Sequence, residues 1–320
     1  MSSKNVDDLP EDIVSYILSL MPTKFAVQTS IISKRWRYRW MFVTNLDFDD
    51  IHHFQGQTST FSNSVNHVIK SCKSSQIQLF RLHFSEWSLP NSCVSYWIDE
   101  AVRLNVCELD LYASLVIMPL SFFSSKTLTK LILHEAHGRV FDLDWRFPCQ
   151  VYLPCLITLD IIFLAAPIAD AFKLIRGCPA LENLSLKVLS NNKERKYIFN
   201  LPTLKRLEIV WASWEYPIDI IVLGVPNLEY LDLNGEKCST FVMEEMSSLV
   251  EASVSFFTLS NLSLFSCKTL TKLSLHDGSN GPLLVFPCQF TFPCVNTLDI
   301  NLSMTPLANA IDLIHNCPNA

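Results

Sequence analysis

The sequence is poor in glycine, with seven glycines among 320 residues, whereas average usage is about 7%. A glycine-rich loop that holds phosphates or a dinucleotide cannot be assembled from so few. Long apolar runs are lacking too: the best candidate, residues 161–168, follows Asp160 and is broken by Pro167, well short of the ~20 residues of a membrane span. The start, MSSKNVDDLPED, is acidic and polar, unlike a signal peptide. We expect no cofactor and no membrane partner.

Catalytic and metal-binding motifs are also lacking. The sequence contains no G-x-S-x-G elbow and no H-E-x-x-H motif, which are common frameworks for an activated nucleophile or a zinc site. Cys149 with Cys155, and Cys288 with Cys294, form two Cys-x5-Cys pairs, but zinc sites more often separate their cysteines by about two to four residues. No paired histidines accompany them, so we predict buried small hydrophobes rather than metal ligands. The protein is therefore expected not to be an enzyme.

The charge balance argues against nucleic acid as a partner. The net charge is −6, whereas a phosphate-binding surface normally carries net positive charge. A basic run does occur at residues 34–39, but residues 1–50 hold six Lys/Arg against seven Asp/Glu. Eleven cysteines without a secretory signal predict an intracellular chain, in the nucleus or the cytoplasm, with reduced and mostly buried thiols. The hydrophobic fraction of 49% excludes intrinsic disorder.

Residues 9–40 have the pattern of three short helices. Pro10 suits a helix start, and apolar residues follow it at steps of three and four. These residues are Ile13, Ile17 and Leu20. Pro22 ends this helix, a second is expected to begin at Thr23 and run to about residue 30, and Ser33 is expected to cap a third. So short a segment cannot bury all of its apolar side chains by itself, so part of its surface is expected to be free for a partner.

From residue 79 onward the chain repeats a leucine-x-x-leucine-x-leucine unit. The central apolar positions are Leu82, Leu109, Leu131, Leu159, Leu184, Leu207, Leu231, Ala252, Leu273 and Leu298. Their spacing of 21 to 28 residues is that of leucine-rich repeats, in which each unit adds one strand to a curved parallel sheet. Alternate residues of each strand point into the core. The return segments are irregular and are expected to vary between helix, turn and extended chain.

Two further patterns refine this organisation. Residues 51–78 form a polar connector in which one short amphipathic helix is expected. Its apolar residues are Phe61, Val65, Val68 and Ile69. A longer duplication lies over the repeats, since KTLTKL at Lys126 recurs at Lys268. A helix is expected from Ile168, and its duplicate from Leu307. No strand follows the second copy, so the solenoid, residues 79–320, is expected to be truncated at its C-terminal end.

Residues that alternate with the core leucines project from the sheet and form a mildly acidic strip with aromatic side chains. Together with two tryptophans of an adjoining segment, the predicted set is Asp110, Tyr112, Asp160, Glu208, Val210, Trp211, Trp214, Tyr230, Asp232 and Asp299. Such a surface suits recognition of a peptide or protein. The alternative is a solvated sheet face whose charge serves solubility.

The N-terminal pattern resembles the plant F-box, which runs LP-acidic-x-hydrophobic, then ILSLxPTK, then SKRWR. The matching residues are Leu9, Pro10, Ile17, Leu18, Leu20, Pro22, Thr23, Lys24, Ser33, Lys34, Arg35 and Trp36. The tail VTNLDFDD, residues 43–50, resembles the segment that follows the F-box in plant F-box proteins with leucine-rich repeats of the FBD type. One departure is Phe25, where that family usually has an acidic residue. The C-terminal FBD segment common in the family is expected to be missing.

The resemblance implies an α/β protein in which a three-helix F-box, residues 1–50, precedes the connector and the leucine-rich-repeat solenoid. It also implies docking to a Skp-family adaptor, and through it to a cullin–RING ubiquitin ligase, with the repeats binding an unidentified target protein. The residues expected to dock are Leu9, Pro10, Ile13, Ile17, Leu20, Pro22, Ile31, Ile32 and Trp36. Two alternatives stay open: a repeat scaffold that recruits no ligase, and a decoy that binds the adaptor without a target.

Overall fold

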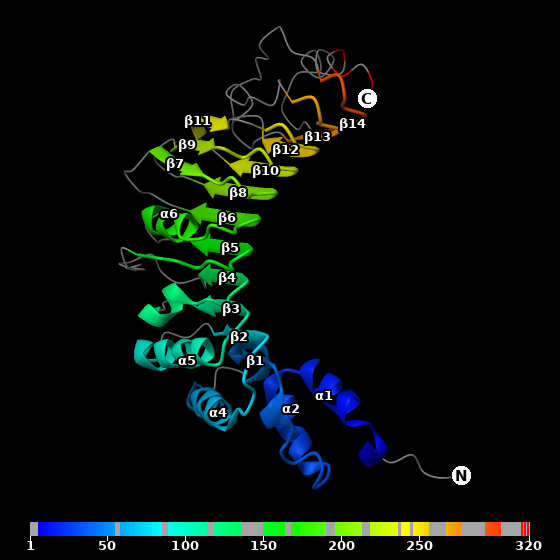
Figure 1. Ribbon diagram of the computed structural model, residues 1–320, viewed down its shortest axis with the longest axis vertical. Coiled ribbons are helices and arrows are strands. Elements are labelled where there is room, and N and C mark those ends of the chain that lie inside the picture. Colours follow the sequence, from blue (N-terminus) through cyan, green and yellow to red (C-terminus); the bar gives the residue numbers. More distant parts are fainter. Residues whose placement is uncertain are drawn as a thin grey trace, which may run out of the picture. The chain divides into compact units, whose positions relative to one another are not determined.

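The computed structural model divides the chain into two compact units, Met1–Leu156 and Ile157–Ala320, and each is an α/β arrangement of parallel strands and return segments (Figure 1). It describes residues 6–54, 58–84, 89–113, 118–135, 150–163, 168–189, 196–212, 218–235, 238–243, 246–255, 267–276 and 292–301, and residues 315, 317 and 319. Within these ranges, no helix is both long enough and apolar enough to cross a membrane.

The first unit opens with a module of short helices. They are the 3-10 helix Val6–Asp8, α1 (Glu11–Ser19), α2 (Thr23–Gln28), and the 3-10 helices Thr29–Ile31 and Arg39–Phe42. The expected third helix from Ser33 is wrong, because residues 34–38 form turns. Two contacts explain the difference: the Arg35 guanidinium donates to the backbone carbonyl of Asp7, and Trp36 turns into the core, where it is buried.

A strand that the repeat pattern did not reveal follows this module. β1 (Asn45–Asp49) pairs in parallel with β2 (Leu79–His83), placing Leu46 opposite Phe80 and Phe48 opposite Leu82. The sheet therefore begins inside the segment assigned to the F-box. The register also corrects the first repeat, since Phe80, not Leu82, lies opposite Leu109. A shift of two residues keeps the same face of a strand, so both Phe80 and Leu82 are buried.

The rest of the first unit alternates strands with helical return segments. These are α3 (Asp50–His53), α4 (Thr58–Ser71), α5 (Asn91–Arg103), β3 (Glu108–Ala113), the 3-10 helix Leu120–Ser124 and β4 (Lys130–Glu135). The helix expected in the connector is confirmed as α4, and its four predicted apolar residues are all buried. α4 and α5 lie side by side on one face of the strands (Figure 1), where the rings of Phe61 and Trp97 meet edge to face at 6.1 Å.

The second unit contains a longer parallel sheet. Its strands are β5 (Thr158–Phe163), β6 (Asn183–Leu189), β8 (Arg206–Ala212), β10 (Tyr230–Gly235), β12 (Glu251–Ser255), β13 (Lys272–His276) and β14 (Thr297–Asn301). The central positions predicted from Leu159 to Leu298 lie opposite one another in every pair. All but Leu298 are buried, because this face of the strands forms the core.

The return segments of the second unit are partly extended, as the irregular repeats predicted. After α6 (Ile168–Arg176), three segments form a second parallel sheet, β7 (Lys196–Asn200), β9 (Ile218–Leu223) and β11 (Cys238–Met243), in the order β11-β9-β7. Gly224, with φ of 58°, follows β9. α6 confirms the helix expected from Ile168. The duplicate helix expected from Leu307 lies almost entirely outside the described residues. The segments around Cys149 and Cys288 lie outside them as well.

The cysteines correct one expectation. Cys155 and Cys294 are exposed rather than buried, because each occupies a turn before a strand. Of the eight cysteines whose side chains the structure describes, only Cys178, Cys267 and Cys317 are buried. Burial raises the pKa of the Cys178 thiol to about 12, so that side chain is an inert core residue. No group of three or more potential metal ligands occurs in the described part of the chain.

Candidate docking surfaces

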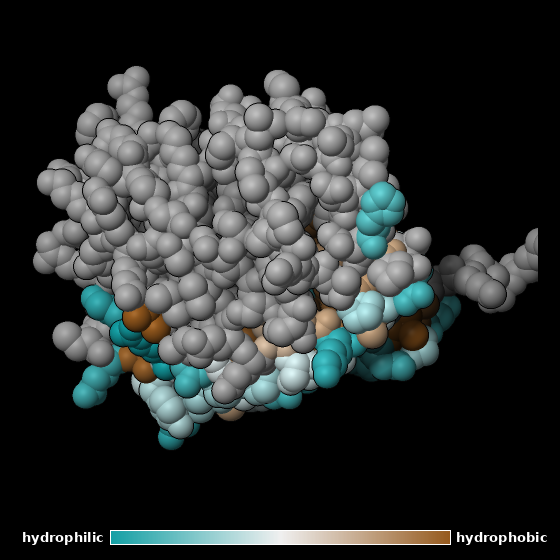
Figure 2. Space-filling model, turned by 90° about the horizontal axis from the view of Figure 1, so that it is seen from above, coloured by the Kyte–Doolittle hydropathy of each residue, from teal (hydrophilic) through white to brown (hydrophobic). Residues whose placement is uncertain are grey.

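Exposed apolar side chains are concentrated on the N-terminal helical module. Residues 6–42 carry nine of the sixteen exposed large apolar side chains that the structure describes. Figure 2 offers a contrast: on the face seen from above, hydrophilic and pale residues predominate in the described part, and hydrophobic ones form small separate groups. Scattered exposed apolar residues are normal for a folded protein, whereas a concentration of them indicates a contact surface.

α1 separates this apolar surface from the core. Val14 and Leu18, four residues apart, are each 1% exposed and point inward. Three other side chains of the same region point outward, with exposed fractions of 41% for Ile13, 62% for Tyr16 and 67% for Leu20. A helix with only one face in contact with its own chain leaves the other face available. The helix is therefore apolar on both sides but packed on one.

The second contribution comes from α2 and the 3-10 turn after it. Ile31 is 88% exposed, and Ile32 and Phe25 are also exposed. The Phe25 ring meets the His53 ring nearly at right angles, with centroids 5.4 Å apart. Plant F-box sequences usually have an acidic residue at this position, so the exposed Phe25 ring enlarges the apolar area of the module. We name these outward residues of the module the apolar face: Ile13, Tyr16, Leu20, Phe25, Ile31 and Ile32.

The predicted docking residues do not all reach this surface. Ile13, Leu20, Ile31 and Ile32 belong to the apolar face, Pro10 is exposed, and Leu9, Ile17 and Pro22 are half-buried. Trp36 is 2% exposed, so in this chain it supports the module from inside and does not present its ring to a partner. The sequence analysis missed Tyr16, although it lies three residues after Ile13 and four before Leu20, which is the spacing of one helix face.

Two arginines of the module's basic run contact the same carboxylate. Arg39 pairs with Glu11, and Arg35 lies 3.5 Å from the same carboxylate. Ser33 donates to the Asp7 carboxylate at 2.6 Å. These contacts tie the N-terminal turn to the segment after α2.

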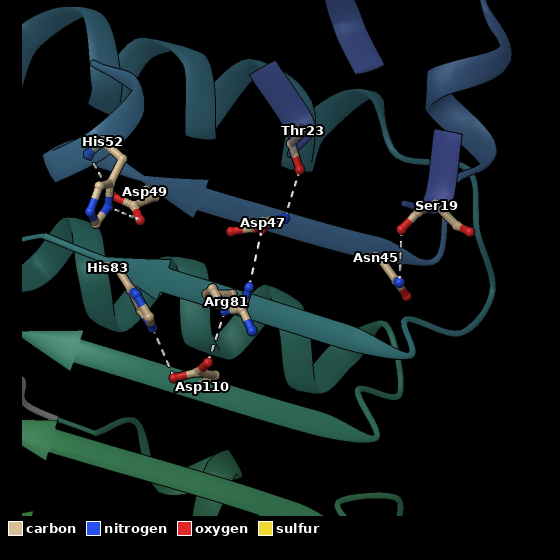
Figure 3. A network of polar contacts seen from close by, with 9 residues as sticks. All are labelled: Ser19, Thr23, Asn45, Asp47, Asp49, His52, Arg81, His83 and Asp110. Carbon is tan, nitrogen blue, oxygen red and sulfur yellow. Dashed lines mark hydrogen bonds and ion pairs between the residues drawn. The ribbon is translucent and has the colours of Figure 1, made fainter. Parts of the chain in front are cut away.

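The module is joined to the sheet by polar contacts to β1 (Figure 3). Thr23 at the start of α2 is buried, and its hydroxyl accepts the Asp47 backbone N–H at 2.7 Å. At the start of the strand, the Asn45 side-chain amide donates to the Ser19 carbonyl at 3.1 Å. α2 therefore packs directly on the first strand, and the module and the first repeats form one body within the first unit.

The projecting face of β1, β2 and β3 carries an ion-pair network (Figure 3). Arg81 donates to Asp110 at 2.8 Å and to Asp47 at 3.3 Å, and His83 is hydrogen-bonded to the second oxygen of Asp110 at 2.9 Å. Burial alone would raise the pKa of Asp110, but the hydrogen bonds from His83 and Arg81 outweigh it and hold the pKa below its ordinary value. Asp110 is 7% exposed, so it orders this face rather than presenting a charge to a partner.

The second unit projects a row of acidic and hydroxyl side chains. Strand register aligns Asp160, Ser185, Glu208, Asp232, Ser253, Ser274 and Asp299 across the seven strands. Burial raises the pKa of Asp232, against the hydrogen bond from Ser253, which lowers it. Beside the row, Arg206 lies over the Tyr230 ring at 4.1 Å from its centroid.

Most of the predicted face residues of this unit lie on the projecting side. Glu208, Val210, Tyr230 and Asp232 are half-buried, and Asp299 is exposed. Asp160 and Tyr112, the latter in the first unit, are half-buried as well. The side chain of Trp211 and all of Trp214 lie outside the part that the structure describes. The alternation of strands thus orients the predicted residues outward, but it does not distinguish a binding surface from a solvated one.

These features define the class: an α/β protein in which a module of short helices precedes a leucine-rich-repeat sheet. Two family models match accordingly. The F-box domain matches residues 6–47, and the leucine-rich repeats of the FBD-associated F-box protein At5g56370 match residues 94–254. The chain belongs to this plant family of F-box proteins with leucine-rich repeats.

Individual relatives agree with this assignment. The F-box/LRR-repeat protein At3g59200 of Arabidopsis thaliana is 33% identical over 264 residues, which cover 79% of this chain and 50% of the relative. The F-box/LRR-repeat protein At4g14103 of the same plant is 32% identical over 259 residues, covering 78% of this chain and 66% of the relative. The putative F-box/FBD/LRR-repeat protein At3g59240 is 33% identical, covering 78% and 51%. The chain spans about half the length of two of these relatives.

Proposed function

We propose that this protein is a non-catalytic substrate receptor of an SCF-type cullin–RING ubiquitin ligase, acting in the nucleus or the cytoplasm. In this proposal the F-box binds a Skp-family adaptor, and the repeats bind a target protein for ubiquitin transfer. Family membership supports the adaptor-binding part of this proposal, because F-box domains generally bind adaptors of this kind.

The observation that carries the proposal is the apolar face. Its six residues are exposed although the same helices bury Val14, Leu18 and Ala26 against their own chain. Interfaces are anchored by a few well-packed apolar and aromatic side chains. Ile31 at 88% and Leu20 at 67% have the largest exposed fractions of the six. They are therefore the anchors we assign to the adaptor.

Target binding is assigned to the projecting side of the strands. In the second unit, the acidic and hydroxyl row lies beside Tyr230 and Arg206, and aromatic and arginine side chains are enriched among interface anchors. The repeat core can stay constant while the projecting residues vary, which suits a family whose members would bind different targets.

Adaptor binding is tested by co-purification and titration with a recombinant Skp-family adaptor. Ile31→Ala and Leu20→Ala should each weaken binding by about tenfold or more, since loss of an anchor commonly costs more than 1 kcal/mol. Leu120→Ala is the matched control: Leu120 is 76% exposed but lies in the 3-10 helix between β3 and β4. Equal affinity of all three variants would refute the assignment of the apolar face.

The receptor role is tested separately by reconstituting the ligase. Candidate targets would be captured by proximity labelling in cells in which the proteasome is inhibited. Ubiquitination of a captured target that depends on Ile31 supports the receptor role. Adaptor binding without ubiquitination of any captured protein would favour a decoy, and repeats that bind a protein without the adaptor would favour a scaffold.

A further inference from the structure

A cavity of about 410 Å³ lies in the first unit between the F-box and the connector. α2, β1, α3 and α4 contribute its walls, so it occupies the joint at which Thr23 bonds to β1. Its floor contains the buried residues Phe48, Phe54 and Val68, and its rim contains the exposed residue His67. The volume falls within the range of about 300–1,000 Å³ that is typical of small-molecule sites.

The ionisable side chains in the described lining of this cavity are all basic residues. Lys24, His53 and His67 line it, and none of its eleven described lining residues carries a carboxylate. The Lys24 ammonium donates to the His53 backbone carbonyl and lies 4.9 Å from the centroid of the Phe54 ring. The adjacent Asp49 is turned to His52, with which it pairs at 2.7 Å. A cation with no carboxylate in the lining can receive an anion.

The hydroxyls on α4 add a second observation. Thr60 and Ser64 line the same space. The Ser64 hydroxyl donates to the Thr60 backbone carbonyl at 2.7 Å, which leaves the Thr60 hydroxyl to donate to an anion.

We propose that this cavity binds a small amphiphilic anion: a carboxylate or phosphate group on an apolar, ring-sized body. The acidic group lies beside Lys24 and the lining histidines, and the apolar body lies against Phe48, Phe54 and Val68. A phosphate alone would leave the apolar floor uncovered, and a neutral ring would leave the cation unmatched. The bound molecule would contact both the F-box helix α2 and the connector helix α4, and would thereby stabilise the joint. This inference does not depend on the ligase role.

The probes are three naphthalene derivatives that differ only in the polar group: 2-naphthoate, 2-naphthyl phosphate and neutral 2-naphthol. Binding to the full chain is measured by calorimetric titration and by the shift in Tm. At least one of the two anions should bind about tenfold more tightly than 2-naphthol, since hydrogen bonds to charged groups are the stronger ones. The stronger of the two anions identifies the acidic group, whether carboxylate or phosphate.

Three variants locate the site. Lys24→Met retains the aliphatic stem but removes the charge, and should reduce the affinity for the anion about tenfold while leaving that for 2-naphthol unchanged. Ser64→Leu fills the cavity without touching Lys24 and should abolish binding of all three probes. Lys70→Met is the control, because Lys70 is an exposed lysine of α4 outside the lining, and it should bind as the wild type does.

Three outcomes would overturn the proposal. The first is no binding of either anion to the wild-type chain up to its solubility limit. The second is equal affinity for the anions and 2-naphthol, which would make the cavity a general apolar site. The third is unchanged anion binding in both Lys24→Met and Ser64→Leu, which would place the molecule elsewhere. The Tm of each variant without probe shows whether it is folded, and Ser64→Leu keeps the test valid if Lys24→Met is destabilised.

Discussion

At the residue scale, two aspartates at equivalent repeat positions have opposite environments. Asp110 follows the core residue Leu109, and Asp232 follows Leu231. The pKa of Asp110 lies below its ordinary value because hydrogen bonds from His83 and Arg81 exceed the effect of burial. The pKa of Asp232 lies above it because burial dominates. The contribution of an aspartate to stability is therefore set by its neighbours on the adjacent strands and not by the residue type alone.

This contrast predicts opposite effects of the same substitution. Asp110→Asn should lower the free energy of unfolding at pH 7 by about 1–3 kcal/mol, because two donors lose a charged acceptor. Asp232→Asn should change it by less than about 1 kcal/mol, or stabilise the protein, because a carboxylate whose ionisation is disfavoured by burial is removed. Denaturant titration of both variants and the wild type checks this.

The pH dependence of the free energy of unfolding is a second test of these opposite pKa shifts. A folded-state pKa below the unfolded value stabilises above the unfolded pKa, and that stability is lost as the pH falls through the folded pKa. The difference between wild type and Asp110→Asn should therefore shrink below about pH 4. For Asp232 the raised pKa stabilises at low pH, and this contribution is lost as the pH rises through the folded pKa. A deficit of Asp110→Asn that is constant from about pH 2.5 to 7 would contradict the network of Figure 3.

At the element scale, the strands were the most predictable part of the chain. All ten central positions lie on strands, because apolar residues at alternate positions, repeated every 21 to 28 residues, leave one way to bury each strand. β1 escaped prediction because its sequence, NLDFD, has only two core residues and follows the F-box without a repeat signal. β7, β9 and β11 escaped it because extended return segments have no period that distinguishes them from loops.

The core assignment of one strand is directly testable. Leu231→Ala on β10 should lower the free energy of unfolding by about 2–5 kcal/mol, since a fully buried leucine leaves a cavity. Asn234→Ala is the control on the same strand, and should change it by less than about 0.5 kcal/mol because its side chain is exposed. Chemical denaturation monitored by circular dichroism measures both. Similar losses in the two variants would contradict the observed orientation of β10.

The F-box shows where sequence reasoning about a site stops. Ile13, Leu20, Ile31 and Ile32 were predicted as docking residues, and their side chains are exposed. Trp36 was placed with them because its motif position is distinctive, but a motif does not say which face of a short irregular segment turns inward. Neither the ion-pair network nor the cavity could be anticipated, since both depend on which side chains β1 brings beside α2, α4 and β2.

At the scale of the whole molecule, burial is uneven along the repeats. The core positions Leu184 and Leu186 of β6 are 2% and 3% exposed, whereas Leu298 and Ile300 of β14 are only half-buried. In a repeat protein each unit is stabilised by its neighbours, so local openings follow local burial. The backbone amides of β14 should therefore exchange hydrogen faster than those of β6 by at least about tenfold. Hydrogen exchange read by mass spectrometry tests this, and equal protection of the two strands in a monomer would contradict it.

The second sheet of the second unit has a geometric consequence. Strands stack at about 4.8 Å, whereas packed helices need about 8–10 Å, so a layer of helices behind a layer of strands forces a solenoid to curve. Between β6 and β11 both layers are strands (Figure 1), their repeat distances match, and the stack there needs little curvature. We therefore expect the stretch that carries Glu208 and Asp232 to curve less than a stretch of the same sheet backed by helices.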